Sequence, residues 1–312
     1  MQPIKNKGVY NALVAQLDKL ARHNRQGSFR TKERYYEACK RFCAFLAGEF
    51  HLQNLSKVSG KHLVAYVLFL QESGKAASTI KTDLAAIRFF HDKLSDAKYR
   101  LPDNSELGIA LERRRFGQLD RTWTPSEFNR ILVAALGAGR EDYVTALYLA
   151  RYAGLRIHEC FRIDTAIARS ALRENVITIK GKGGKVRTIP IEDARIPLML
   201  KKMLAKTKAG HKLLVPDGIP TDQAIHRLET FIYEHRTEIQ DTNDTRPLTF
   251  HGLRHAYAAE KYKKLMDGGA SALDAHFTVS RLLGHERADV TDIYLASVKK
   301  KGGGNQVRKM RT

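Results

Sequence analysis

The 312-residue sequence lacks any apolar run that approaches the ~18 residues needed by a membrane-spanning helix. This predicts a protein that does not span a membrane. The first nine residues, MQPIKNKGV, also lack the apolar segment of a secretory signal peptide. We therefore expect a cytoplasmic protein that has no membrane partner.

Cysteine is scarce, with only Cys39, Cys43 and Cys160 in the chain. This small odd number excludes a disulfide framework and suits a reducing compartment. Cys39 and Cys43 lie four residues apart on an apolar helical stripe, and no second Cys/His pair stands at a metal-binding spacing, so we expect them to be buried. The sequence shows no set of carboxylates typical of a metal site either, and we expect neither a metal nor another cofactor.

Acidic residues are few relative to basic ones. Lysine and arginine number 54 against 33 aspartates and glutamates, which gives a formal charge of +21. Residues 1–119 and 120–312 share this excess almost equally. A polyanion held between two basic lobes is the simplest explanation, although charge alone does not distinguish it from a merely basic protein.

The first part of the chain is predicted to be a small helical domain over residues 1–112. Apolar residues recur every three or four positions over 9–20, 35–46, 63–70 and 80–94, which indicates amphipathic helices. Ser78 or Thr79 is the expected cap of the last of these helices. The polar faces carry basic residues, among which Lys32, Lys81 and Arg88 are candidate DNA contacts.

A basic linker is predicted over residues 113–123, where Arg113, Arg114 and Arg115 could cross a phosphate backbone. The next residues predict a helix start, with Thr124 as N-cap, Pro125 at the first helical position and Glu127 at the capping-box position.

The second predicted domain, residues 124–298, mixes helices with one β-hairpin. Ile177 and Ile179 alternate on one strand, Ile189 and Ile191 alternate on the other, and residues 181–185 (GKGGK) form the turn. Helices are expected over 125–136, 141–153, 194–207, 222–239, 250–265 and 288–298. Residues 299–312 form a basic, glycine-rich tail.

Four segments of this second domain hold residue types suited to chemistry. They are GLRIHE at 154–159, the hairpin turn with Lys182, HGLRH at 251–255, and LGH at 283–285 followed nine residues later by Tyr294. Each alone has an ordinary structural explanation, such as a basic residue at a helix end or a flexible turn. The GKGGK turn does not match the order of a Walker A phosphate loop.

Together and in this order, the segments resemble those of the tyrosine recombinase (phage integrase) family. The resemblance spans nearly the whole chain. It implies a mainly α-helical protein with a small β-hairpin, in which a SAM-like core-binding domain precedes a mixed α/β catalytic domain. It also implies a simple two-domain, site-specific DNA recombinase that works as a homotetramer on double-stranded DNA through a Holliday junction and is a monomer or weak oligomer without DNA.

The resemblance gives each residue of the set a role. Arg156 and Arg254 would grip the phosphate with bidentate hydrogen bonds, and His251 and His285 would add hydrogen bonds and proton transfer. Lys182 would protonate the 5′-oxygen as it leaves, with Lys185 as the alternative because the turn can be aligned in either register. Tyr294 would be the nucleophile that forms a 3′-phosphotyrosine. Glu159 would hold one of these side chains in place.

Two departures from the family pattern stand out. The connection from Tyr262 to Phe277 is longer than usual, which we expect to enlarge a loop or helix near the site, and the threonine often found after the second histidine of HGLRH is absent.

Two other functions stay open. A type IB topoisomerase shares the Arg–Lys–Arg–His–Tyr chemistry, and a basic DNA-binding protein with a decayed site would share the charge. The expected role is integration or excision of a mobile element by an enzyme associated with the nucleoid.

Overall fold

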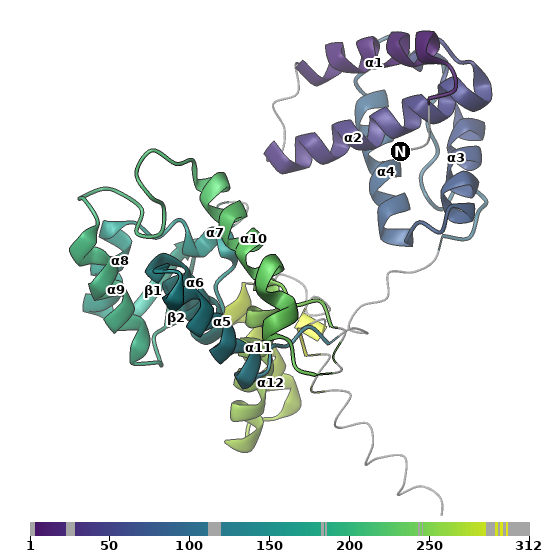
Figure 1. The fold of residues 1–312 in the computed structure, drawn as a ribbon. Coiled ribbons are helices and arrows are strands. Elements are labelled where there is room, and N and C mark those ends of the chain that lie inside the picture. The colour runs from purple at the N-terminus through teal and green to yellow at the C-terminus, as the bar shows by residue number, and fades with distance from the viewer. Residues whose placement is uncertain are drawn as a thin grey trace, which may run out of the picture. The chain divides into compact units, whose positions relative to one another are not determined.

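The structure is a computed structural model, and it describes residues 4–22, 29–111, 120–181, 184, 186–242, 244, 246–284, 291, 292, 294, 295 and 298. The chain divides into two compact units, Met1–Arg114 and Arg115–Thr312. Figure 1 labels the helices and strands of each unit. None of the helices in the described ranges is both long and apolar enough to cross a membrane.

The first unit contains the four expected helices, which are α1 (Lys7–Arg22), α2 (Phe29–Phe45), α3 (Gly60–Glu72) and α4 (Ala77–His91). A π-helical turn, Leu46–Phe50, and a 3₁₀ turn, Leu55–Lys57, connect α2 to α3. The expected cap of α4 was wrong, because Ala76 is the N-cap and both Ser78 and Thr79 lie inside the first helical turn.

The core of the first unit is apolar but encloses one carboxylate. Asp83 of α4 is buried, and its oxygens accept hydrogen bonds from Arg41 of α2 at 2.8 Å and from the Tyr66 hydroxyl of α3 at 3.1 Å. A buried charge is tolerated when it is paired and hydrogen-bonded in this way. Cys39 and Cys43 are free and buried in the same core, as their spacing predicts.

The second unit is helical around one hairpin. Its elements are α5 (Pro125–Gly137), α6 (Glu141–Ala153), α7 (Ile157–Cys160), α8 (Thr165–Glu174), β1 (Val176–Lys180), β2 (Val186–Pro190), α9 (Arg195–Lys206), α10 (Thr221–Ile239), α11 (Phe250–Asp267) and α12 (Ala272–Leu283). The start of α5 is confirmed: Thr124 caps the helix, Pro125 follows, and Glu127 completes the capping box. The sequence prediction had missed α7, α8 and α12.

The hairpin has the expected pairing. β1 and β2 are antiparallel, and Ile177 lies opposite Ile189. Both isoleucines are buried, as is Ile179, so one face of the hairpin packs on the core and the other faces solvent. Within the hairpin, β1 contacts α8 and β2 contacts α12.

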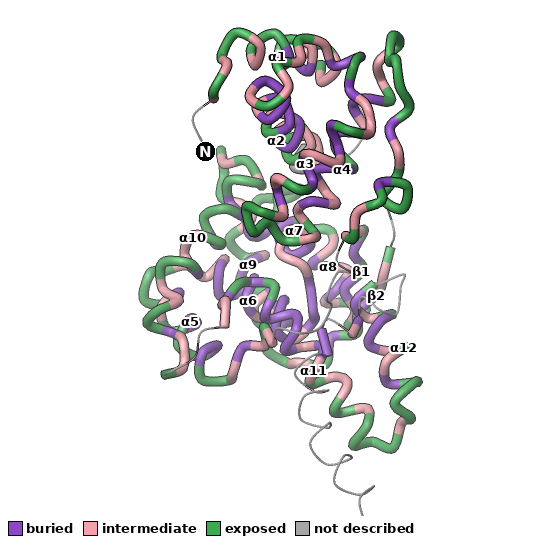
Figure 2. The backbone as a smooth tube through the Cα atoms, turned by 90° about the vertical axis from the view of Figure 1, so that its right-hand side faces the viewer, coloured by how far each residue is buried: buried purple, intermediate pink, exposed green. Residues whose placement is uncertain are grey.

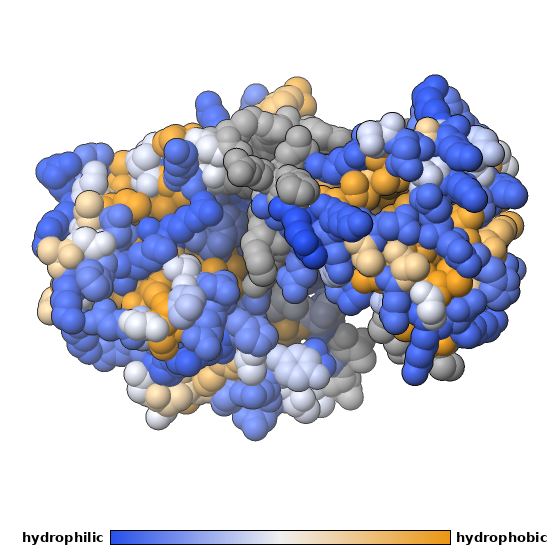
Figure 3. All heavy atoms as spheres, turned by 90° about the horizontal axis from the view of Figure 1, so that it is seen from above, coloured by the Kyte–Doolittle hydropathy of each residue, from blue (hydrophilic) through white to orange (hydrophobic). Residues whose placement is uncertain are grey.

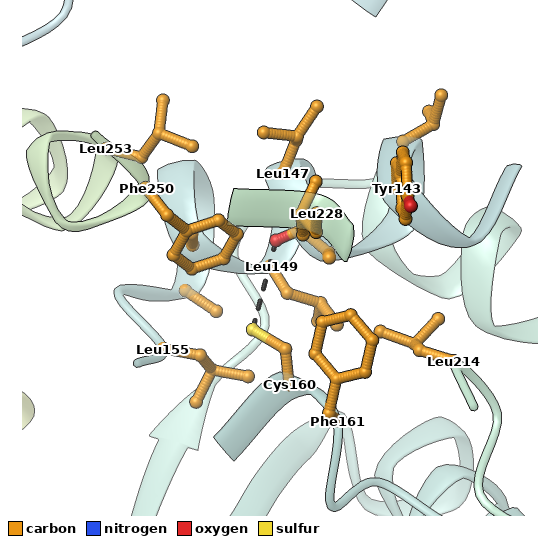
Figure 4. Close-up of a cluster of buried hydrophobic side chains, with 14 of the residues drawn as sticks. Tyr143, Leu147, Leu149, Leu155, Cys160, Phe161, Leu214, Leu228, Phe250 and Leu253 are labelled. Carbon is orange, nitrogen blue, oxygen red and sulfur yellow. Dashed lines mark hydrogen bonds between the residues drawn. The ribbon is translucent and has the colours of Figure 1, made fainter. Parts of the chain in front are cut away.

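The core of the second unit surrounds α6, a helix buried along most of its length. Buried residues gather inside each unit in Figure 2, and hydrophilic residues cover much of the surface visible in Figure 3. The close-up in Figure 4 shows Leu155 and Cys160 among the buried side chains, with the Cys160 thiol 3.8 Å from the carbonyl oxygen of Ala146. These two residues enclose the Arg156–Glu159 segment in sequence, so the core fixes both of its ends.

The long connection between the HGLRH and LGH segments is a helical hairpin. α11 continues to Asp267, a turn follows, and α12 begins at Ala272. The inner faces of the two helices enclose a small apolar cluster that includes Ala258, Val279 and Leu295. The connection from Tyr262 to Phe277 therefore consists of the end of one helix, a short turn and the start of a second helix packed against the first.

Candidate active site

The Arg156 segment is shaped by a capping box. Arg156 is the N-cap of the short helix α7, and the Glu159 carboxylate accepts from its backbone N–H at 2.8 Å and from its guanidinium at 2.9 Å. A glutamate three residues after the N-cap is the spacing that closes such a box. Glu159 is fully buried, whereas Arg156 keeps part of its side chain exposed. The local sequence therefore fixes an arginine at the edge of a buried carboxylate.

Arg254 is held between the C-terminal ends of two helices. Its guanidinium donates to the carbonyl oxygen of Gly154 at the end of α6 and to that of Leu283 at the end of α12. Helix ends leave such carbonyls without intrahelical partners and carry partial negative charge, so they suit a cation. Arg254 is completely buried, and burial lowers its pKa to about 10, which still leaves it charged at neutral pH.

Three arginines surround the Glu159 carboxylate. Besides Arg156, Arg187 of β2 donates to Glu159 Oε2 at 2.5 Å, and Arg254 Nη1 lies 4.0 Å from the same oxygen. Burial alone would raise the pKa of Glu159, but the charge of Arg187, then the Arg156 N–H and the other two guanidiniums, hold it below its ordinary value. Sequence analysis did not single out Arg187, because its alternating strand pattern shows no sign of this distant partner.

The Tyr294 hydroxyl meets a histidine. It lies 2.9 Å from Nε2 of His251, the first residue of the HGLRH segment. The His255 ring stacks on the Tyr294 ring with centroids 4.3 Å apart, and the Arg254 guanidinium lies 5.5 Å from the same ring. His255 is not among the residues to which the family resemblance gives a role. The structure thus brings Arg156, Glu159, His251, Arg254 and Tyr294 together.

Both histidines are neutral at physiological pH. Partial withdrawal from water, aided by the charges of Arg254 and Arg156, lowers the pKa of His251 to about 4, although the residue as a whole is exposed. Burial, then the effects of His251, Arg121 and Arg254, lowers the pKa of His255 to about 3. A neutral imidazole has one nitrogen that accepts a hydrogen bond, so His251 can receive the proton of a phenol.

The low pKa of His255 predicts acid-sensitive folding. The unfolded chain takes up this proton near pH ~6.5, whereas the folded chain resists until about pH 3, so stability falls as the pH drops between these values. The expected slope from this residue is about 1.4 kcal/mol per pH unit. His255→Phe keeps a ring beside Tyr294 but cannot titrate, and urea unfolding between about pH 4.5 and about pH 6 should show a shallower slope. An unchanged slope would contradict this origin.

The glycine of the GLR segment meets two demands at once. Gly154 ends α6 with a φ of +62°, a conformation that favours glycine, and a Cβ there would lie 2.4 Å from the Tyr257 ring. Tyr257 is therefore packed against the Arg156 segment, and burial raises its pKa to about 12. Tyr257 and Tyr262 are the tyrosines nearest to Tyr294 in the sequence, but among the described tyrosines the structure pairs only Tyr294 with His251.

A second close approach fixes the start of α11. The chain at 121–123 crosses Gly252, and the Trp123 indole donates to the Thr249 carbonyl oxygen at 2.9 Å. A Cβ at Gly252 would lie 2.3 Å from the carbonyl oxygen of Arg121 and 2.6 Å from the Trp123 ring. Only glycine allows this crossing beside His251.

Gly252→Ala should therefore destabilise the second unit. The added methyl meets a backbone carbonyl and a buried indole, so we expect a loss of at least ~2 kcal/mol in the free energy of unfolding. Gly137→Ala is the matched control, because nothing lies within 4 Å of its Cβ position. Urea unfolding of both variants measures this loss. Equal midpoints would show that the 121–123 segment moves aside for the methyl group with no loss of stability.

Several predicted site residues lie outside the described residues. They are Lys182, Lys185, His285, Arg113, Arg114 and Arg115, together with the tail 299–312. Of the predicted DNA contacts, Lys32 lies on α2 and Lys81 on α4. Arg88 instead binds its own unit, donating to the Pro102 carbonyl oxygen at 2.7 Å and to Asn104 at 2.9 Å, which favours a structural role over contact with DNA.

Comparison with known families accounts for both units. Residues 121–301 match the model of the phage integrase family, and residues 14–101 match that of the phage integrase N-terminal SAM-like domain. The chain is 24% identical over 280 residues to the tyrosine recombinase XerD of Halalkalibacterium halodurans, covering 85% of this chain and 86% of that protein.

Solved structures share the fold. A λ integrase dimer (residues 75–356) bound to a COC′ core site matches with a TM-score of 0.65 and 16% identity, covering 90% of this chain and 94% of the other. A λ integrase tetramer bound to a Holliday junction matches with a TM-score of 0.62 and 18% identity, covering 90% and 76%.

Proposed function

Because the chain belongs to the phage integrase family of tyrosine recombinases, we propose that it cleaves and rejoins duplex DNA at specific sites through a covalent bond to Tyr294. The observation that carries the assignment of residues is the contact between the Tyr294 hydroxyl and His251 Nε2 at 2.9 Å. This contact supports Tyr294 as the nucleophile and His251 as the neutral base that accepts its proton, with Arg156 and Arg254 of the same chain nearby.

The proposed cleavage step is a transesterification, in which the phosphorus exchanges its bond to the 5′-oxygen for a bond to the Tyr294 oxygen. The Tyr294 oxygen attacks the phosphorus, its proton passes to His251, and the bond from phosphorus to the 5′-oxygen breaks. Lys182, with Lys185 as the alternative, supplies the proton that the leaving 5′-oxygen takes up. The products are a 3′-phosphotyrosine and a free 5′-hydroxyl, and attack by a 5′-hydroxyl reverses the step without ATP.

The charge of the site supports a phosphate ligand. Among its described residues, three guanidinium groups face the single carboxylate of Glu159. An excess of positive charge in a largely buried site favours the anionic phosphodiester and favours still more the additional charge that develops during attack. Arg156, which is partly exposed, and Arg254 are the proposed phosphate ligands, and His285 is proposed to add a hydrogen bond.

The proposed partners are DNA and further copies of this chain. Both halves of the sequence carry an excess of positive charge, which supports binding of duplex DNA by both units. Lys32, Lys81 and the Arg113–Arg115 linker are the proposed contacts. The λ integrase tetramer on a Holliday junction supports, by fold alone, a proposal that four copies exchange strands through such a junction. Integration or excision of a mobile element at the nucleoid is the proposed biological role.

Covalent capture on random DNA tests this function. The full chain is incubated with random-sequence duplexes, denatured, and the DNA that stays attached is sequenced. We expect attachment at Tyr294 and enrichment of one DNA site. Attachment without sequence preference, together with relaxation of plasmids that lack the site, would instead support a type IB topoisomerase, and no attachment at all would support a non-catalytic DNA-binding protein.

Cleavage should not depend on a divalent metal ion. The proposed chemistry draws its positive charge from Arg156 and Arg254 and its proton from a lysine, which are roles that a metal fills in other phosphoryl-transfer enzymes. We expect covalent adducts to form at the same rate in excess EDTA as in buffer with Mg²⁺. An absolute requirement for Mg²⁺ in the cleavage step would overturn the proposed mechanism.

A further inference from the structure

Arg187 joins three parts of the site that are distant in sequence. It lies on β2 opposite Ile179, yet its side chain is only 11% exposed. Its guanidinium donates to Glu159 Oε2 and to the carbonyl oxygen of Leu282 near the end of α12. One side chain thus links the hairpin, the Arg156 segment and the helix that leads to the LGH segment.

The packing around Arg187 leaves it little freedom. A Cβ on Gly284, which follows α12, would lie 2.9 Å from Arg187 Cδ, so the glycine makes room for the arginine stem. The neighbouring carbonyls of Leu282 and Leu283 accept from Arg187 and Arg254 respectively. The two guanidiniums therefore share one helix end and one carboxylate.

The buried negative charge of Glu159 needs a compensating positive charge, which Arg187 can provide. Glu159 is completely buried and stays charged, so it needs a cation close by. Its candidates besides Arg187 are Arg156 and Arg254, the two proposed phosphate ligands. Arg156 already donates to Glu159 at 2.9 Å. Without Arg187, the whole negative charge of Glu159 would fall to these two guanidiniums and compete more strongly with a DNA phosphate for them.

We propose that Arg187 is a positioning residue that neutralises and orients Glu159, so that Arg156 and Arg254 present their positive charge to the phosphate of DNA. Arg187 acts through Glu159 and needs no contact with DNA, consistent with its burial. The inference rests on the proposed function and deepens it, because it explains how a carboxylate is accommodated at a site for an anion.

A DNA-free experiment tests the charge pairing first. Arg187→Gln, Glu159→Gln and the double variant are compared with the original chain by urea unfolding. Arg187→Gln should destabilise the fold by leaving the carboxylate with less compensation, and adding Glu159→Gln should not destabilise it further, because both charges are then gone. Losses that simply add would overturn the pairing, and this result is independent of any DNA activity.

A cleavage experiment tests the consequence for the phosphate site. It uses the duplex recovered by covalent capture and measures adduct formation at saturating protein. Arg187→Gln should slow adduct formation on the order of 10- to 100-fold, the range seen when partners that orient ligand residues are removed. Adding Glu159→Gln should slow it no further. Arg187→Lys, which keeps the charge, serves if the glutamine variant is poorly folded, and should retain part of the rate.

Arg162→Gln is the matched control. Arg162 is exposed and also touches the hairpin, its guanidinium donating to the Lys180 carbonyl oxygen at 3.2 Å. Its backbone N–H donates to the Glu159 carbonyl oxygen at 3.2 Å, a contact that the substitution keeps, and its guanidinium is not among the three that the structure describes around the Glu159 carboxylate. This variant removes the same charge from the same hairpin and should cleave at nearly the original rate. An equal loss in both variants would show that general charge or hairpin order is responsible and would overturn the proposal.

A second substrate distinguishes the phosphate ligands from the leaving group. In it, sulfur replaces the 5′-bridging oxygen, and a thiolate leaves without the help of an acid. If Arg187 acts through Arg156 and Arg254, the Arg187→Gln defect should persist on this substrate. Recovery of the rate would show that Arg187 serves the lysine of the hairpin instead. If the original chain forms no adduct on either duplex, the proposed function fails and only the unfolding result bears on Arg187.

Discussion

Tyr294→Phe should abolish covalent attachment to DNA while leaving DNA binding intact. The substitution removes only the hydroxyl that lies on His251, and the ring stays in place against His255 and Arg254. Tyr294 is 5% exposed, so its ring also helps to close the small cluster between α11 and α12. We therefore expect a folded protein that has lost its nucleophile.

Gel electrophoresis under denaturing conditions measures the adduct, and a mobility-shift titration measures binding. Tyr257→Phe is the matched control, since Tyr257 is also largely buried but packs on Gly154, and this variant should still form adducts. Adducts that persist in Tyr294→Phe would place the nucleophile on another residue.

Arg254→Lys and Arg156→Lys should each slow cleavage on the order of 10² or more, the loss seen when one preorganised oxyanion donor is removed. Lysine keeps the positive charge but loses the planar fork of donors. At Arg254 the fork also spans two helix ends, at Gly154 and Leu283, which a single ammonium group cannot bridge in the same way. Arg254→Lys should therefore lower the stability of the fold as well, whereas Arg156→Lys should change it less.

Single-turnover cleavage at saturating protein measures the two losses separately from DNA affinity. Arg173→Lys is a suitable control, because Arg173 is well exposed on α8 and its guanidinium pairs with the neighbouring Glu174. Normal cleavage by both lysine variants at the site would show that Arg156 and Arg254 do not bind the phosphate.

Local rules predicted the hairpin of this site, because isoleucines alternate on both sides of a glycine-rich turn. The holding role of Glu159 was implied by the family resemblance alone, and the capping box with Arg156 is a finding of the structure. Arg187 escaped notice because its partner Glu159 is 28 residues away and belongs to another element. The alternating pattern of a strand shows which face a residue occupies, but it does not identify the charged residue of another element that packs against that face.

The missed helices share a physical reason. The buried residues of α8 are Thr165, Ala168 and Ala171, which are small. Its large apolar residues that pack against the core, Ile167 and Leu172, are only partly buried and lie five positions apart, so the sequence shows no clear helical period. The four residues of α7 are too few to show any period. The Gly268–Gly269 turn separates α11 from α12 and made the long connection look irregular, although both sides of it are helical.

The contact between Tyr294 and His251 lies within one polypeptide, and so does the whole set of arginines. A Tyr294→Phe subunit lacks the nucleophile, and an Arg254→Lys subunit lacks a phosphate ligand. If each site is built from one chain, neither subunit can supply the missing group to the other. Co-expression of the two alleles should therefore fail to complement. If strand exchange requires several subunits to react in one assembly, either allele should also be dominant-negative over an intact copy, because each defective subunit that joins the assembly stops it.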